Sequence, residues 1–383
     1  MDRSWPWIIT AASAAVLLGR AGGVLGRFSG EDPEIFYFAA RTRGLGPVFE
    51  PFGGYVHVVP RLVAWLTAWA PVDDAAVVMR LLVLGCWLLT AVVAARACEG
   101  VTGDRRIGAL AATAVVLAPI ASESALGVLA NVHFPLLVLV VVLLVRRPDT
   151  VGGIAAATVA VLLVGLSDPL AATLVAPAVA LDPGWWVRTR RAWPIVVASA
   201  VALAVQVPTY LSTAGGRHER NPLLPWAGMS RLWLVAWILP PAAAAATIVV
   251  LRARRSDGAG RLGWCVAWCT LYLSLVSHAL GGLADRYWVA PSALAVVAVA
   301  TALRAVAVAH AGRARVIGAA IAVAYAVLAI GAFAPRQFLR DGLAWREAVA
   351  VARIECAATG AAAVRIDTVG GAIDAAPCSL FDN

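Results

Sequence analysis

The chain has 383 residues, of which 61% are hydrophobic and 14% are charged. This balance excludes an ordinary soluble domain and is typical of a protein that crosses a membrane several times. The formal net charge of +9 comes from arginine alone, because the chain contains no lysine. Since these arginines collect at the ends of apolar segments, where they anchor to lipid headgroups, the charge does not indicate a nucleic-acid-binding protein.

The first apolar segment covers residues 5–26. Its basic start, apolar centre and small residues near the end resemble a secretory signal peptide with a cleavage site. We expect a retained membrane span instead, because the polar segment that follows needs a tether.

Residues 27–76 follow as a loop and contain the longest polar interruption in the first two thirds of the chain. The acidic pair Glu31-Asp32 comes directly after the first span. An unpaired acid near a membrane costs several kcal/mol, so each such residue is a candidate functional site. Two interpretations stay open: Asp32 caps a helix that starts near Pro33, or one carboxylate is a general base in a partly desolvated cleft. We interpret Asp73 and Asp74 as helix caps, because they follow a proline.

The second half of the loop reads PFGGYVHVVPRL and combines Tyr55, His57 and Arg61. Tyr55 and His57 share a face if the backbone is extended, and His57 and Arg61 share one if it is helical. In either case aromatic, imidazole and guanidinium groups converge, which suits a sugar or a phosphate.

About eleven apolar segments are long enough to cross a bilayer as helices. We place them near residues 5–26, 77–97, 106–121, 129–145, 152–166, 169–182, 193–212, 231–251, 262–281, 287–308 and 314–334. Arginine clusters mark the cytoplasmic turns, for example at Arg105-Arg106 and Arg146-Arg147. The amino terminus is then cytoplasmic, and an odd number of spans puts the first loop and the carboxyl terminus outside.

Three later motifs lie at outer helix ends: NVHF with Asn131 and His133, LSDP with Asp168, and DRYW with Arg286-Tyr287. A guanidinium at the outer face suits the phosphate of a lipid whose tail lies between helices. The alternative is that Arg286 snorkels to headgroups. Asp168 either caps the helix that begins at Pro169 or faces a cavity.

The tail, residues 335–383, is polar and contains a stretch with helical spacing followed by short strand-like segments. It includes Cys356 and Cys378, which we expect to form a disulfide outside the cytoplasm. The other four cysteines lie in or beside apolar spans, where a thiol packs as a small hydrophobe. We therefore expect a transmembrane domain at 1–334 and a small extracytoplasmic cap at 335–383.

Together, the Glu-Asp pair, GGYVHVVPRL, NVHF, LSDP and DRYW resemble the multi-spanning actinobacterial membrane proteins of the C-type glycosyltransferase (GT-C) class, over residues 25–300. The resemblance implies an all-α polytopic protein of the plasma membrane. It also implies transfer of a sugar, with inversion, from a polyprenyl-phosphate donor to a cell-envelope acceptor, such as a glycan or a lipid-linked molecule. Asp32, or else Glu31, would be the general base.

One base, together with positive charge on the departing phosphate, suffices for such a displacement. Arg286 and Arg61 are the candidates for that charge. Some members of the class use a divalent cation such as Mg or Mn, but this sequence shows no ligand cluster for one. The predicted substrate-binding residues are Tyr55, His57, Arg61, Asn131, His133, Asp168, Arg286 and Tyr287.

Two other functions remain open. A non-catalytic transporter or flippase of polyprenyl-linked sugars would carry the same arginine and aromatic residues without needing a base. A ligase that joins a polymer to a lipid-linked glycan would need a much wider outer cavity.

Overall fold

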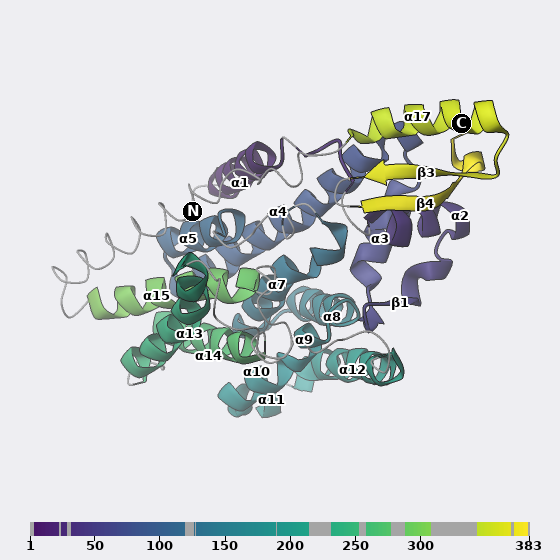
Figure 1. Ribbon diagram of the computed structural model, residues 1–383. Helices are drawn as coiled ribbons and strands as arrows, with labels where there is room; N and C mark the ends of the chain where they lie inside the picture. Colours follow the sequence, from purple (N-terminus) through teal and green to yellow (C-terminus); the bar gives the residue numbers. More distant parts are fainter. Residues whose placement is uncertain are drawn as a thin grey trace.

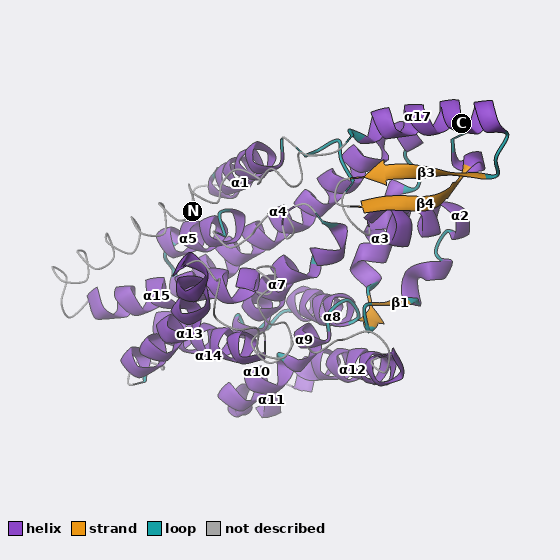
Figure 2. Ribbon diagram, viewed as in Figure 1, coloured by secondary structure: helices purple, strands orange, loops and turns teal. Residues whose placement is uncertain are grey.

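The computed structural model describes most of the chain as helix, with short antiparallel β-hairpins (Figures 1 and 2). The described residues are 4–22, 24–28, 32–118, 126, 128–188, 190–213, 231–252, 258–276, 288–307, 343–368 and 371–381. Outside the first loop and the carboxyl terminus, the helices are α1 (Trp5–Ala21), α4 (Ala75–Thr102), α5 (Arg105–Val116), η4 (Leu129–Asn131), α7 (His133–Val145), α8 (Val151–Gly165), α9 (Pro169–Thr173), α10 (Val175–Leu181), α11 (Pro183–Arg188), η5 (Arg190–Ala192), α12 (Trp193–Thr213), α13 (Arg231–Leu251), α14 (Gly258–Val276) and α15 (Val289–Ala307).

The apolar segments expected to cross the membrane are largely helical where they are described. Three helices in the described part of the chain are long and apolar enough to span a bilayer: Val72–Thr102, Trp193–Thr213 and Gly258–Val276. These helices indicate a membrane location. The expected span at 314–334 lies outside the described residues.

One expected span, 169–182, is not a single helix. α9 ends at Thr173 and α10 begins at Val175. Pro177 explains the break, because it has no N–H to donate to the carbonyl of Thr173 four residues earlier, and its ring crowds that carbonyl. The segment is therefore a broken helix rather than the continuous span that its hydropathy predicts.

Small residues let the helices approach closely, as is common between helices in membranes. A Cβ added to Gly108 of α5 would lie 2.7 Å from the carbonyl oxygen of Ala95 in α4, and one added to Gly165 of α8 would lie 2.9 Å from the Cβ of Ala202 in α12. α4 packs against α1, α5 and α7, whereas α12 packs against α8 and α9. Helices α13, α14 and α15 pack on one another.

The first loop folds into a series of short elements. They are η1 (Asp32–Phe38), a π-helix, followed by α2 (Ala39–Arg43), η2 (Gly46–Phe49), β1 (Pro51–Phe52), β2 (Tyr55–Val56), α3 (Val58–Thr67) and η3 (Val72–Asp74). Gly53 and Gly54 have φ angles of 60° and 100°, which permit the two-residue turn between β1 and β2.

Later helices satisfy the backbone of this loop. Gln206 of α12 is fully buried, and its amide accepts from the N–H of Val56 at 2.9 Å and donates to the carbonyl of the same residue at 3.1 Å. The Ser167 hydroxyl accepts from the N–H of Val59 at 2.8 Å, and the N–H of Val58 donates to the carbonyl of Leu166. These bonds fix β2 and the start of α3 against α12 and the turn between α8 and α9.

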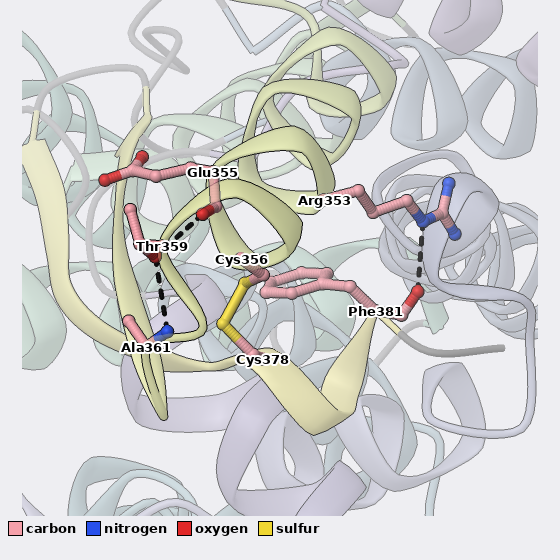
Figure 3. Close-up of a disulfide and its surroundings, with 7 residues drawn as sticks. All are labelled: Arg353, Glu355, Cys356, Thr359, Ala361, Cys378 and Phe381. Atoms are coloured by element: carbon pink, nitrogen blue, oxygen red, sulfur yellow. Dashed lines mark hydrogen bonds between the residues drawn. A yellow bond between two sulfur atoms is a disulfide. The ribbon is translucent and has the colours of Figure 1, made fainter.

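The C-terminal unit, residues 343–368 and 371–381, comprises α17 (Trp345–Thr359), β3 (Ala363–Thr368), β4 (Gly371–Pro377) and η9 (Cys378–Leu380). The predicted bond between Cys356 and Cys378 is present, with Cα atoms 5.8 Å apart (Figure 3). Arg353 donates from Nε to the carbonyl of Phe381 at 3.1 Å, so the chain end lies on α17. Figure 1 shows this unit, in yellow, beside the purple elements of the first loop.

The expectation that Asp73 and Asp74 act as helix caps is wrong. Asp74 directly precedes α4, but its side chain accepts no capping hydrogen bond. The two carboxylates pair instead with arginines of α17, Asp73 with Arg353 and Asp74 with Arg346. α17 lies against this end of the first loop, and hydrogen bonds between charged groups are stronger than those to a neutral backbone N–H.

Gly263 in α14 provides a test of the helix packing. A Cβ at this position would lie 2.3 Å from Thr301 Oγ1 and 2.5 Å from Leu251 Cδ1, so we expect Gly263→Ala to lower the free energy of unfolding by about 1–3 kcal/mol. Gly85→Ala is the matched control, because its Cβ would meet nothing within 4 Å and alanine is the better helix former. Thermal unfolding in detergent measures both; equal midpoints for the two variants would contradict this packing.

Candidate functional site

Asp32 is the first residue of η1, and it is buried, with 2% of its surface exposed. Its carboxylate accepts from the backbone N–H of Leu129 at 3.0 Å and from that of Ala130 at 3.3 Å. These N–H groups open η4, directly before α7, where helical N–H groups lack partners within the helix. Asp32 therefore binds the start of a helix 97 residues away.

A ring cluster lies where the first loop meets α7. The ring centroid of His57 is 4.2 Å from that of Tyr55 and 5.8 Å from that of His133. The rings of Phe36 and Phe52 complete the cluster, at 6.0 Å and 5.7 Å from His57. The structure thus brings GGYVHV of the loop and NVHF of α7 together.

His57 itself is buried, and its Nε2 lies 3.0 Å from the carbonyl oxygen of Phe52. Burial lowers the pKa of His57 to about 4, against the opposing effect of that hydrogen bond. The imidazole is therefore neutral at physiological pH, with Nε2 as the donor to Phe52. A neutral ring offers its second nitrogen, Nδ1, as an acceptor.

Asp168 joins the same cluster through His133. Its Oδ2 lies 3.7 Å from His133 Nε2, and both side chains are buried. Asp168 also caps α9, since its Oδ1 accepts from the N–H of Leu170 at 2.9 Å. Burial raises the pKa of the Asp168 carboxyl to about 7. The structure thus confirms the cap and places the other carboxylate oxygen near His133.

The arginines of the first loop contact the loop itself. Arg61 donates to the carbonyl of Ile35 and lies over the ring of Phe36, with Cζ 4.9 Å from the ring centroid. Arg41 donates to the carbonyls of Ala68 and Ala70, and Arg43 pairs with Glu50. These contacts join α3 to η1, α2 to the segment that follows α3, and α2 to the residue that follows η2.

Two buried polar residues near this site are not evident from the sequence analysis. Arg80 of α4 donates from Nη2 to the carbonyl of Arg27 at 2.7 Å. Its guanidinium also interacts electrostatically with the carboxylate of Asp32. Gln206 holds β2, as described above. The signal for both was available, because each is a polar side chain inside an apolar segment, and such residues are rare unless they have a partner.

Asn131 ends η4 and is buried next to the backbone groups that Asp32 binds. The predicted site residues Glu31, Arg286 and Tyr287 lie outside the described residues. Within the described residues, no three His, Cys, Asp or Glu side chains are grouped as ligands for a metal ion. A small pocket that is partly open to solvent lies between α7, α10 and α14, where Arg147, Asp182 and Trp186 are among its lining residues, and none of the predicted site residues lines it.

Two substitutions at Asp168 separate its capping role from its charge. We expect Asp168→Ala to lower the free energy of unfolding by about 1 kcal/mol through loss of the cap, whereas asparagine keeps a capping oxygen. Because burial raises the folded-state pKa of Asp168 to about 7, its contribution to stability is fully present below its ordinary pKa of about 3.8 and is lost as pH rises towards 7. Asp168→Asn should therefore gain stability relative to the wild type as pH rises from 4.5 to 7, as measured by unfolding midpoints. A constant difference across that range would contradict the raised pKa.

The lowered pKa of His57 predicts the opposite pH dependence. Its contribution is fully present above its ordinary pKa of about 6.5 and is lost as pH falls towards about 4, because the unfolded chain binds the proton more readily. His57→Gln keeps a donor for Phe52 but does not titrate. We expect the unfolding midpoint of His57→Gln to rise relative to that of the wild type as pH falls from 7 to 4.5. If the difference does not change, the imidazole is not buried as described.

The comparisons with known proteins concern the fold. No protein-family model matches the chain, and no curated protein sequence matches it. Among solved structures, the chain is similar to the crystal structure of ArnT from Cupriavidus metallidurans in the apo state. The two share 21% sequence identity with a TM-score of 0.51, over 91% of this chain and 69% of that chain. The described helices therefore form an ArnT-like membrane-protein fold.

Proposed function

We propose that this protein is a membrane glycosyltransferase of the GT-C class that transfers a sugar from a polyprenyl-phosphate donor to a cell-envelope acceptor outside the cytoplasm. The observation that carries this proposal is the junction of the first loop with α7, where the buried carboxylate of Asp32 binds the start of η4 and a cluster of aromatic and imidazole rings of the loop packs against His133 at the start of α7. The ArnT-like fold supports it, because ArnT is a GT-C glycosyltransferase with a lipid-linked donor.

In the proposed reaction, a hydroxyl oxygen of the acceptor attacks the anomeric carbon of the donor sugar. The bond from that carbon to the phosphate oxygen breaks, its electron pair stays on the polyprenyl phosphate, and the configuration inverts. The hydroxyl proton passes to Asp32, or to Glu31 beside it. The N–H groups of Leu129 and Ala130 would hold the carboxylate of Asp32 in place while it takes the proton.

The ring cluster would bind the sugar. Tyr55 and His57 offer adjacent ring faces, and neutral His57 offers Nδ1 as an acceptor for a sugar hydroxyl. His133, Asn131 and Asp168 would complete the polar contacts. Arg286 and Tyr287 remain the candidates for the donor phosphate. No step is assigned to a divalent cation, because the described residues offer no ligand set for one.

We assign the first loop and the C-terminal unit to the extracytoplasmic side, with the amino terminus in the cytoplasm. The bond between Cys356 and Cys378 supports this orientation, because disulfides persist in oxidising compartments and are rare in the cytosol. The arginine-rich turns, such as Arg105-Arg106 and Arg146-Arg147, would then lie on the cytoplasmic side.

A second function is favoured by one observation. The carboxylate of Asp32 already accepts hydrogen bonds from two backbone N–H groups, which is a complete structural role. A non-catalytic transporter or flippase of polyprenyl-linked sugars would need that structural role and no base. Substitution of Asp32 distinguishes the two functions.

We expect Asp32→Asn to reduce sugar transfer by at least about 100-fold, in line with loss of a general base. The asparagine oxygen keeps a hydrogen bond to the N–H of Leu129, so folding and donor binding should be retained. Glu34→Gln is the matched control, because Glu34 is an exposed acid on the same short helix.

Turnover is measured as release of polyprenyl phosphate from a panel of polyprenyl-phosphate pentoses and hexoses, with cell-envelope glycan as the acceptor. Donor binding is measured separately with the purified protein. A fully active Asp32→Asn variant would rule out Asp32 as the base. The transporter would be favoured if the wild type transfers no sugar and if Asp32→Asn moves the donor across vesicle membranes as fast as the wild type does.

A further inference from the structure

The C-terminal unit contacts both ends of the first loop through one residue, Trp345. Its backbone N–H donates to the carbonyl of Gly26 at 2.8 Å, just before the loop begins. Its indole Nε1 donates to the carbonyl of Val72 at 2.5 Å, where the loop ends. The side chain is 2% exposed, so these hydrogen bonds are shielded from solvent. Trp345 thus joins the two ends of a segment of more than forty residues.

The same indole packs against η1, the π-helix that begins at Asp32. Its ring lies 4.6 Å from that of Phe28, edge to face, and 6.3 Å and 6.2 Å from those of Tyr37 and Phe38. Aromatic pairs at these distances contribute about 0.5–1.5 kcal/mol each beyond the area that they bury. Tyr37 and Phe38 form the last turn of η1, so Trp345 contacts the opposite end from Asp32.

Two ion pairs fix how α17 lies across η3. Arg353 binds Asp73 with two parallel hydrogen bonds of 2.9 Å, and Arg346 pairs with Asp74. These pairs are partly exposed, so each contributes little to the stability of the fold. Their geometry nevertheless sets the register of α17, because a guanidinium held by two hydrogen bonds permits one orientation.

η1 needs such support from its surroundings. A π-helix is rare. It usually appears as a single turn inside an α-helix, frequently at a functional site. One side of η1 is held by Arg61, which donates to Ile35 and covers Phe36. Trp345 holds its far end. Loss of Trp345 would remove the aromatic contacts at this far end of η1.

We propose that Trp345, assisted by the Arg353–Asp73 pair, is a positioning residue that holds Asp32 at the start of α7. This inference rests on the proposed function for its catalytic consequence. Its structural part, the hold of the C-terminal unit on η1, stands independently. On the proposed function, the unit is thus a part of the active-site framework.

The test replaces Trp345 by leucine in the full-length protein. Hydrogen exchange of the peptide that covers residues 32–40 reports on η1 directly and needs no substrate. We expect this peptide to exchange at least about tenfold faster in Trp345→Leu, because its local opening becomes easier. Arg365→Gln is the matched control, since within the described part of the chain Arg365 pairs with Asp367 and Asp374, both inside the C-terminal unit.

Turnover is measured on the same samples. Misplacement of a catalytic group by about 1 Å lowers the rate by about 100-fold, so kcat should fall by between 10-fold and 100-fold. KM for the polyprenyl-phosphate sugar should stay within about twofold, because Trp345 does not contact the donor. Trp345→Phe keeps a ring against Tyr37 but loses the donor to Val72, and it should give intermediate values for both exchange and kcat.

A double-mutant cycle covers the case in which Trp345→Leu does not fold. Asp73→Asn, Arg353→Gln and the double variant should show exchange that is faster by about two- to fivefold, because the pair is partly exposed, with non-additive effects that reveal the pair. Unchanged exchange at residues 32–40 in all of these variants would overturn the proposal. So would faster exchange with unchanged kcat in an active enzyme. A wild type without transferase activity would refute the proposed function, while the exchange result would still decide whether the C-terminal unit holds η1.

Discussion

The structure depends on hydrogen-bond partners for the backbone polar groups of an irregular segment that is packed among apolar helices. Such a segment cannot rely on water, and each unpaired N–H or carbonyl costs several kcal/mol there. The first loop meets this requirement with side chains from distant helices. Gln206 binds both backbone groups of Val56, Ser167 binds Val59, and Asp32 binds the free N–H groups at the start of η4. The loop is therefore ordered by its partners.

Asp32 is the clearest example, because one side chain links the loop to the start of α7. A carboxylate is well suited to this position, since the N-terminal end of a helix carries partial positive charge and unpaired donors. The same bonds hold the oxygens in a defined direction, which is what a general base requires. In this protein, the group proposed for the chemistry is also a group on which the local fold depends.

Much of the architecture could be predicted from the sequence. Hydropathy located the helices, and the motifs GGYVHV, NVHF and LSDP were expected at one end of the helices, where His57, His133 and Asp168 now meet. Local pattern did not reveal partners far along the chain. Asp73 follows a proline, which predicts a helix cap. Its partner, Arg353, lies 280 residues later, where a local pattern cannot show it. Arg80 and Gln206 lie within apolar segments, so local pattern does not show that their partners are in the first loop, and Pro177 breaks a span that hydropathy alone would continue.

The contact between Trp345 and Val72 also has a consequence for biosynthesis. The two residues are 273 positions apart, so the ribosome completes the loop long before it makes the tryptophan that closes it. During that interval, the aromatic side chains of Phe28 and Tyr37 lack their final cover. In the proposed orientation the tail must also be exported and oxidised before closure. A message cut short near its 3′ end would therefore yield a chain with most of its helices inserted but with an uncovered aromatic surface, which is the kind of defect that membrane proteases recognise.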